Sequence, residues 1–390
     1  MTTIAPRRQD LDTLVNRVAA VAAAQADATD REARFPTEAL EEMRQTRLLG
    51  LTVPREHDGL GGSLADLIDV TERLARSDMS VAMIFAMHCQ QVAALVGYAG
   101  QPLRDELLPR VAAGEVYLAS VTTALGTGGS LLNSAEELAM RDEYLLLDRF
   151  APIVTGGGYA DGFLVTMRSP DAMTDTQVSL LYADRGQLTI EATGNWQPLG
   201  MRATHSGALR LRGTLPAYQV VGEHGRFHEI VSATFGPLAH LGWSAAWLGT
   251  ANGVLSRVVS LLRDRRTRGS LKLDSELLLT RLADARQRLT AVYALLGHTA
   301  QVVQRGENLT HPRVQMLING LKVTASEQCY AAVDDLVEAV GLRHGYLRDS
   351  VTRLERALRD LRSASLNYSN DRLRIPSGKL VLLDPEVRFD

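Results

Sequence analysis

The chain has 390 residues, of which 45% are hydrophobic and 22% charged, a composition typical of a globular protein with two or three domains. The formal net charge is −3, so the chain offers no positive field for the phosphate backbone of a nucleic acid. The N-terminus lacks the apolar core of a signal peptide, and no uninterrupted apolar run approaches the roughly 18 to 20 residues of a membrane-spanning helix.

The first part of the chain shows helical periodicity. Apolar side chains recur at helical spacing over Leu11–Val21, and Phe35–Thr37 is typical of a helix start. The glycine-rich segment 59–63 interrupts this pattern, an amphipathic stretch follows it, and Val81–Tyr98 is apolar enough to be buried on most sides. We therefore expect residues 1–115 to form an all-helical N-terminal domain.

The period changes in the middle of the chain. Short runs with the composition of strands are separated there by Gly, Pro, Asp and Asn, and these runs are Tyr144–Leu147, Phe163–Met167, Val178–Tyr182, Leu188–Ile190 and Leu209–Leu211. Residues 116–222 are therefore predicted to form a middle β-domain, either a barrel or a sandwich.

Long helical patterns return after the β-region. One apolar stripe is predicted to contain Leu278, Leu282, Ala285, Leu289, Val292, Tyr293 and Leu296. Further helices are expected at 321–340 and 351–366, and long helices with short connections predict a four-helix bundle within residues 223–390. The expected fold class is mainly α with a central β-domain.

The cysteine content argues against two kinds of stabilising site. Cys89 and Cys329 are the two cysteines of the chain, and they belong to no CxxC pair or Cys/His cluster. Neither a disulfide framework nor a metal site is predicted, and a reducing, cytoplasmic compartment fits best.

Seven segments carry motifs that follow one another in a recognisable order. They are Pro54–Gly62, Val121–Ser130, Phe150–Asp161, Trp196–Ser206, Arg265–Gly269, Glu338–Tyr346 and Leu354–Asp360. In this order, with helices on both sides of a β-domain, they resemble the acyl-CoA dehydrogenase superfamily from about Phe35 to Leu373. The resemblance implies that family's fold, in which an N-terminal helical domain, a middle β-domain and a C-terminal four-helix bundle follow one another.

The same resemblance implies a flavin, FAD or FMN. Segments 121–130 and 150–161 stand where the family's loops meet the flavin ring, since glycines let the backbone come close and N–H groups face the ligand. The cofactor-binding residues implied in this way are Thr122, Thr123, Gly128, Gly129, Ser130, Thr155, Gly156, Arg265 and Gly341. Arg268 replaces a Phe of the family's motif and Glu338 a Gln, which would suit a weakly held or diffusing flavin.

The family's catalytic base has no counterpart at either of its usual positions. Most members remove an α-proton with a carboxylate, which lies eight residues after the Asp that matches Asp360. That count reaches Tyr368, a phenol with an ordinary pKa of about 10. The alternative position of some relatives falls on Ala239, beside His240. Either His240 or Tyr368 acts as an unusual base, or the reaction needs no α-proton removal.

Three functions are compatible with these patterns. The favoured hypothesis is a monooxygenase that uses reduced flavin and O2 to hydroxylate carbon or nitrogen in a small biosynthetic intermediate. Trp196 with Ala203-Thr204 resembles the superfamily's monooxygenase branch, and His88 resembles a His that this branch places near the flavin. The catalytic candidates are thus His88, Tyr368 and His240.

The alternatives differ in substrate and in partners. One is an atypical α,β-dehydrogenation of an acyl thioester bound to CoA or to an acyl carrier protein, and the other is a non-catalytic homologue. The favoured hypothesis implies a separate flavin reductase. The resemblance also implies a homotetramer or homodimer, since the family's bundle is usually buried between subunits.

Overall fold

The computed structural model describes residues 8–124, 131–264, 274–306 and 308–387. The chain divides into two compact units. Unit 1 comprises Met1–Leu67, Ile84–Gln197 and Ala203–Ala239, and unit 2 comprises Ile68–Met83, Pro198–Arg202 and His240–Asp390. Each unit is described by itself.

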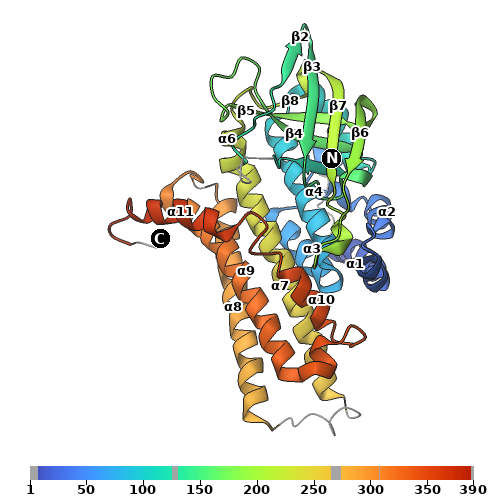
Figure 1. Ribbon diagram of the computed structural model, residues 1–390, viewed down its shortest axis with the longest axis vertical. Helices are drawn as coiled ribbons and strands as arrows, with labels where there is room; N and C mark the ends of the chain where they lie inside the picture. The colour runs from blue at the N-terminus through green and yellow to red at the C-terminus, as the bar shows by residue number, and fades with distance from the viewer. Residues whose placement is uncertain (1–7, 125–130, 265–273, 307, 388–390) are drawn as a thin grey trace. The chain divides into compact units, whose positions relative to one another are not determined.

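Unit 1 combines helices with two four-stranded sheets (Figure 1). Its helices are α1 (Arg8–Glu32), α2 (Thr37–Gln45), most of α4 (Met79–Tyr98), α5 (Gln101–Ala112) and α6 (Phe227–Ile230). Its strands are β1 (Leu118–Val121), β2 (Ala139–Arg141), β3 (Tyr144–Ala151), β4 (Gly162–Arg168), β5 (Val178–Asp184), β6 (Leu188–Thr193), β7 (Ala208–Pro216) and β8 (Val220–Val221).

The two sheets differ in their burial. The first has the order β1-β4-β5-β8, with β1 parallel to β4, and β4 and β5 are buried on both faces except at their last residues. The second has the order β2-β3-β7-β6, and β3 alternates buried and more exposed residues as a strand with one core face does. The predicted strands are all present, and β1, β2 and β8 are additional to them.

The core of unit 1 joins its helices to its first sheet. Side chains of α4 and α5 pack with those of β4, β5 and β8, and Phe227 and Phe235 close the same cluster. By length and composition α4 could cross a membrane, but 83% of its most apolar window is buried inside the protein. This burial is the behaviour of a core helix.

Unit 2 is helical (Figure 1). It contains most of α3 (Leu64–Ser77) and of α7 (Gly236–Arg263), together with α8 (Glu276–Gln304), α9 (Pro312–Gly341), α10 (Leu354–Leu361) and α11 (Asn370–Val381). Helix α9 packs against α8, α10 and α11. Helix α11 is additional to the predicted helices.

The apolar stripe predicted on α8 is buried at five of its seven positions, half-buried at Leu282 and wrong at Tyr293. Leu278, Ala285, Leu289, Val292 and Leu296 are buried, whereas the side chain of Tyr293 is 65% exposed. Successive residues of a helix are about 100° apart around its axis, so Tyr293 turns away from the face that carries Val292.

Candidate functional site

Two loops that the sequence places far apart are joined in unit 1. The hydroxyl of Thr123, just after β1, donates a hydrogen bond to the carbonyl of Ile153, just after β3, at 2.9 Å. The guanidinium of Arg149, which is buried, donates to the carbonyl of Thr123 at 2.7 Å. The segments that carry Thr123 and Thr155 therefore form one surface.

Two groups of hydroxyls lie on these segments and on residues 204–206. The hydroxyls of Thr155 and Ser206 lie 3.1 Å apart, and those of Thr204 and Ser206 lie 2.8 Å apart. The hydroxyl of Thr122 lies 3.2 Å from that of Ser120. Each hydroxyl can donate one hydrogen bond and accept others. These side chains can therefore exchange a hydrogen bond with each other for one with the polar edge of a ligand ring, without a change in charge.

Gly156 is required where the backbone turns beside this cluster. Its φ is +61°, in the left-handed region, and its N–H donates to the carbonyl of Thr204 at 2.9 Å. A Cβ at this position would lie 2.5 Å from the hydroxyl of Tyr117 and 2.8 Å from the ring of Phe35. Both the torsion angle and the space therefore favour glycine.

An aromatic stack borders the same turn. The rings of Phe35 and Tyr159 stack with centroids 4.2 Å apart, and His205 meets Tyr159 edge-on at 5.7 Å. His205 has φ +44°, an uncommon value for a residue with a side chain. Strained torsions of this kind concentrate at functional sites, and the sequence analysis assigned no role to this stack.

His88, which the resemblance places near the flavin, has backbone partners at both ring nitrogens. Its side chain is fully buried, its Nε2 lies 2.8 Å from the carbonyl of Leu49, and its Nδ1 accepts from the N–H of Leu118 at 3.1 Å. Burial lowers the pKa of His88 to about 4, so the ring is neutral at pH 7. Because backbone groups occupy both nitrogens, the geometry favours a structural role that fixes the start of β1.

In unit 2 a buried cation organises the segment that carries Tyr368. The ammonium group of Lys322, on α9, donates to the carbonyls of Ala364 and Tyr368 at 3.1 and 2.8 Å and to Oδ1 of Asn370 at 2.7 Å. Lys322 is fully buried, and burial lowers its pKa to about 8. Its Nζ also lies 5.6 Å from the ring centroid of Trp247.

Tyr368 itself is held in a strained conformation. Its φ is +51°, which costs a residue with a side chain on the order of 1–2 kcal/mol. Its carbonyl accepts from Lys322, and the next turn is anchored by Asn370, which donates to Ser326 and to Glu327. The backbone of Tyr368, the residue that the resemblance aligns with the family's carboxylate, is therefore held by Lys322.

A row of buried polar atoms without partners lies on α7. His240 Nδ1, Trp243 Nε1, Ser244 Oγ and Trp247 Nε1 have no hydrogen-bond partner among the described residues. Their spacing of three, four and seven residues places them on one face of the helix. An unmade hydrogen bond costs about 1–3 kcal/mol for each buried group, so these four atoms are unsatisfied polar groups of the protein interior.

His240 is neutral at physiological pH. Burial, and then the positive charge of Lys322, lower its pKa to about 4, while the backbone of Ile318 acts in the opposite direction. The imidazole can therefore accept a proton or a hydrogen bond at Nδ1. Trp243 and Trp247 can only donate at theirs.

Two further motifs meet within unit 2. The N–H of Met201 donates to Oδ1 of Asp360 at 2.6 Å, and a Cβ on Gly200 would lie 2.1 Å from the carbonyl oxygen of Arg359. The order of the motifs in the sequence gave no sign of this contact.

The remaining predicted flavin residues lie elsewhere or outside the described part of the chain. Gly341 ends α9 with φ +69° and lies next to no atom that an added Cβ would meet. Gly128, Gly129, Ser130 and Arg265 lie outside the described residues.

Comparison with known proteins identifies the family. The model of the acyl-CoA dehydrogenase N-terminal domain matches residues 7–115, and the model of the acyl-CoA dehydrogenase C-terminal domain matches residues 238–367. The mitochondrial isobutyryl-CoA dehydrogenase of Dictyostelium discoideum is 22% identical over 339 residues, which cover 86% of this chain and 79% of that protein.

Two solved structures show the same fold. FMN-bound TdsC from Paenibacillus sp. A11-2, a dibenzothiophene monooxygenase, superposes with a TM-score of 0.85 at 19% identity, over 98% of this chain and all of that one. Butyryl-CoA dehydrogenase from Megasphaera elsdenii gives a TM-score of 0.83 at 17% identity, over 97% of this chain and all of that one.

The chain belongs to the acyl-CoA dehydrogenase superfamily. The predicted fold class, mainly α with a central β-domain, is confirmed. Its structural relatives include both a monooxygenase and dehydrogenases, so the reaction has to be argued from the residues of this chain.

Proposed function

We propose that the protein is a flavin-dependent monooxygenase that hydroxylates a carbon or nitrogen atom of a small biosynthetic intermediate. The observation that carries the proposal is the chemistry around the position of the family's base. The resemblance aligns Tyr368 with that base, and its carbonyl accepts a hydrogen bond from the buried cation Lys322, whose charge also acts on the neutral imidazole of His240. Glu327, the carboxylate of this network, is 41% exposed and accepts from Asn370 and Arg374.

The residues of unit 1 fit a flavin, FAD or FMN. Thr122, Thr123 and Thr155 offer hydroxyls on the segments that follow β1 and β3, and the lack of a Cβ at Gly156 lets the turn after Thr155 pack against Tyr117 and Phe35. The FMN-bound structure of TdsC supports this choice of cofactor. When bound, the flavin would supply the two-electron chemistry, and these residues would hold its polar edge.

The row on α7 would hold and orient the substrate. The indole N–H groups of Trp243 and Trp247 can donate to a substrate oxygen, and Nδ1 of neutral His240 can accept from a hydroxyl or amine. Lys322 adds a positive potential in a region of low dielectric, which favours a substrate with a partly negative oxygen. None of these roles requires a carboxylate.

The cofactor assignment is tested by Thr155→Val, with Thr189→Val on the exposed part of β6 as the matched control. We expect the Thr155 variant to bind FMN and FAD about two- to tenfold more weakly in fluorescence titrations, because a hydrogen bond between neutral groups is worth about 0.5–1.5 kcal/mol. Equal affinities in both variants would contradict the placement of the flavin at this surface.

A second candidate is the atypical dehydrogenation of an acyl thioester, carried by CoA or by an acyl carrier protein. The free Nδ1 of His240 favours it, since a neutral imidazole is a possible base for an α-proton. Anaerobic bleaching of the oxidised flavoprotein by butyryl-CoA or isobutyryl-CoA would establish this function. The monooxygenase instead requires a supply of reduced flavin from a reductase.

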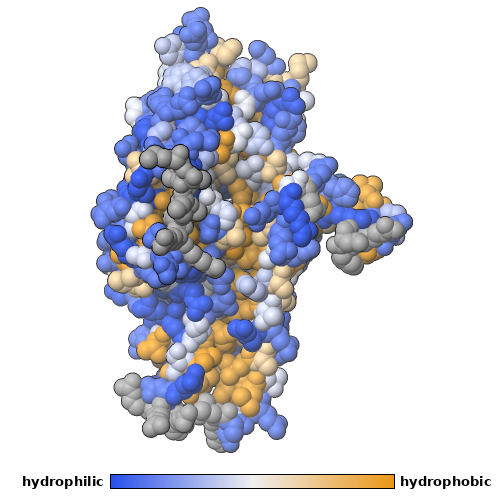
Figure 2. Space-filling model, turned by 180° about the vertical axis from the view of Figure 1, so that it is seen from behind, coloured by the Kyte–Doolittle hydropathy of each residue, from blue (hydrophilic) through white to orange (hydrophobic). Residues whose placement is uncertain are grey.

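A homo-oligomer, a dimer or tetramer, is part of the same proposal. Figure 2 shows apolar side chains gathered along the helical bundle, and Leu277, Leu279 and Tyr293 of α8 are 53–65% exposed. Contiguous apolar surface of this kind is typical of subunit interfaces. Light scattering after size-exclusion chromatography measures the mass directly.

A further inference from the structure

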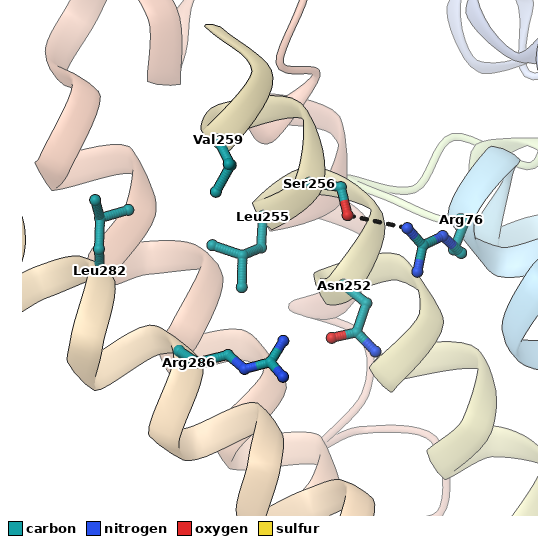
Figure 3. A pocket seen from close by; sticks show the side chains of 7 residues that line it. All are labelled: Arg76, Asn252, Leu255, Ser256, Val259, Leu282 and Arg286. Atoms are coloured by element: carbon teal, nitrogen blue, oxygen red, sulfur yellow. Dashed lines mark hydrogen bonds between the residues drawn. The ribbon is translucent and has the colours of Figure 1, made fainter. Parts of the chain in front are cut away.

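A groove of about 480 Å³ opens on unit 2 between α7 and α8 (Figure 3). Its lining consists of Arg76, Asn252, Leu255, Ser256, Val259, Leu282 and Arg286. It shares no residue with the Lys322 cluster or with the hydroxyl groups of unit 1.

The groove has an apolar and a polar side. Leu255 and Val259 of α7 face Leu282 of α8, while Arg286 points across toward Asn252 (Figure 3). The α7 residues follow one another by three or four positions, which places them on one helix face. A volume of this size is within the range of about 300–1,000 Å³ that small-molecule sites occupy.

The polar side carries a positive charge. The guanidinium of Arg76 donates to the hydroxyl of Ser256 at 2.9 Å, which leaves its charge uncompensated by that contact. Arg286 is exposed, and its side chain has no hydrogen bond or ion pair with another described residue. Two guanidinium groups therefore border one groove.

One carboxylate lies near these arginines. Glu72 accepts a hydrogen bond from Asn252 at 2.9 Å, and burial raises its pKa. The amide of Asn252 thus satisfies part of the hydrogen-bonding capacity of Glu72. Arg286 forms no ion pair with a described carboxylate, so two guanidinium groups and the one carboxylate of Glu72 leave a net formal charge of +1 at the groove.

We propose that this groove binds an amphipathic organic anion, in which a carboxylate or phosphate monoester is attached to a hydrocarbon body. The guanidinium groups of Arg286 and Arg76 contact the oxyanion, for which their planar donor geometry is well suited. The hydrocarbon lies on Leu255, Val259 and Leu282. Both kinds of ligand have an oxyanion at one end of an apolar chain.

A second copy of the chain fits this groove less well than such an anion. In a twofold interface the same patch meets itself, so a contact centred here would bring Arg76 and Arg286 toward the same arginines of the partner. Like charges held close together oppose association. A bound anion instead attracts both guanidinium groups of one chain.

The test compares Arg286→Gln with Arg141→Gln, which removes one positive charge from the exposed strand β2. Calorimetric titration at pH 7.5 uses octanoate, octyl phosphate and the neutral octanol. We expect the wild type and the Arg141 variant to bind octanoate or octyl phosphate alike and more tightly than octanol, and the Arg286 variant to bind the anions at least about tenfold more weakly. The tighter of the two anions identifies the headgroup.

Three results would overturn the proposal. They are the absence of anion binding by the wild-type protein, equal binding of octanol and the anions, and equal loss of affinity in both variants. A change of molecular mass on Arg286→Gln without a change in anion affinity would assign the groove to a second copy instead. Because no flavin or turnover enters the measurement, its result is separate from that of the proposed function.

Discussion

Replacing Lys322 by Met tests the buried cation on which the candidate substrate site depends. The long apolar side chain of Met fills a similar volume but cannot donate to Ala364, Tyr368 and Asn370. The loss of these hydrogen bonds lowers stability, while the removal of a buried charge raises it. The effect of removing the charge depends on pH, whereas the effect of losing the hydrogen bonds largely does not.

The sign of the pH effect follows from the pKa of Lys322. Burial lowers this pKa from 10.5 to about 8 in the folded protein. Below pH 8 both the folded and the unfolded states carry the proton, so the whole cost of the buried charge is present. Between pH 8 and 10.5 the folded state releases the proton before the unfolded state does, and the wild type gains stability relative to the variant.

The size of this gain follows from the same two values. The difference between 10.5 and about 8, at about 1.36 kcal/mol for each pH unit, corresponds to about 3 kcal/mol in total. Between pH 7.5 and pH 10 about 2 kcal/mol of it is realised. Other titrating groups are common to both proteins and cancel in the difference.

Urea denaturation at pH 7.5 and at pH 10, followed by tryptophan fluorescence, measures the free energies of unfolding. We expect the difference between the wild type and the Lys322→Met variant to shift by about 2 kcal/mol in favour of the wild type at the higher pH. A difference that is the same at both pH values would refute the assignment of Lys322 as a buried, charged group.

Two other substitutions test the structure of unit 1. Gly156→Ala should lower the free energy of unfolding by about 1–3 kcal/mol and weaken flavin binding. The control is Gly207→Ala, whose Cβ would meet no atom within 4 Å and which should do neither. Equal effects of both variants in thermal denaturation would contradict the steric argument. His88→Ala should cost about 2–4 kcal/mol, because the carbonyl of Leu49 and the N–H of Leu118 lose their partner. If its only effect were on turnover, with unchanged stability, His88 would be catalytic.

The order of elements could be predicted from the sequence because the hydrophobic period changes twice along the chain. The strands that were not predicted are short: β8 has two residues and β2 has three exposed ones. Helix α11 contains Pro376 and has little apolar character. Neither the length nor the composition of these elements distinguishes them from loops.

The candidate site was predictable only in part, because its contacts join distant segments. Motif order indicated the loops of Thr123 and Thr155, but the hydrogen bond from Thr123 to Ile153 depends on the pairing of the strands. Lys322 escaped prediction because a lysine within a long helix is usually exposed. Lys322 lies four residues after Ile318 and three before Ala325, both of which are buried. This spacing places it on the buried face of the helix, and it was the one sign in the sequence that Lys322 is buried.

The central claim is that the protein uses reduced flavin and O2, and it is tested most directly by rapid mixing. The protein is titrated anaerobically with reduced FMN or FAD, and O2 is then added while the absorbance of oxidised flavin is followed. We predict binding of the reduced flavin and a reoxidation that is slower than that of free flavin and proceeds in more than one phase. Reoxidation at the rate of free flavin, together with anaerobic bleaching of the oxidised flavoprotein by butyryl-CoA, would contradict the claim.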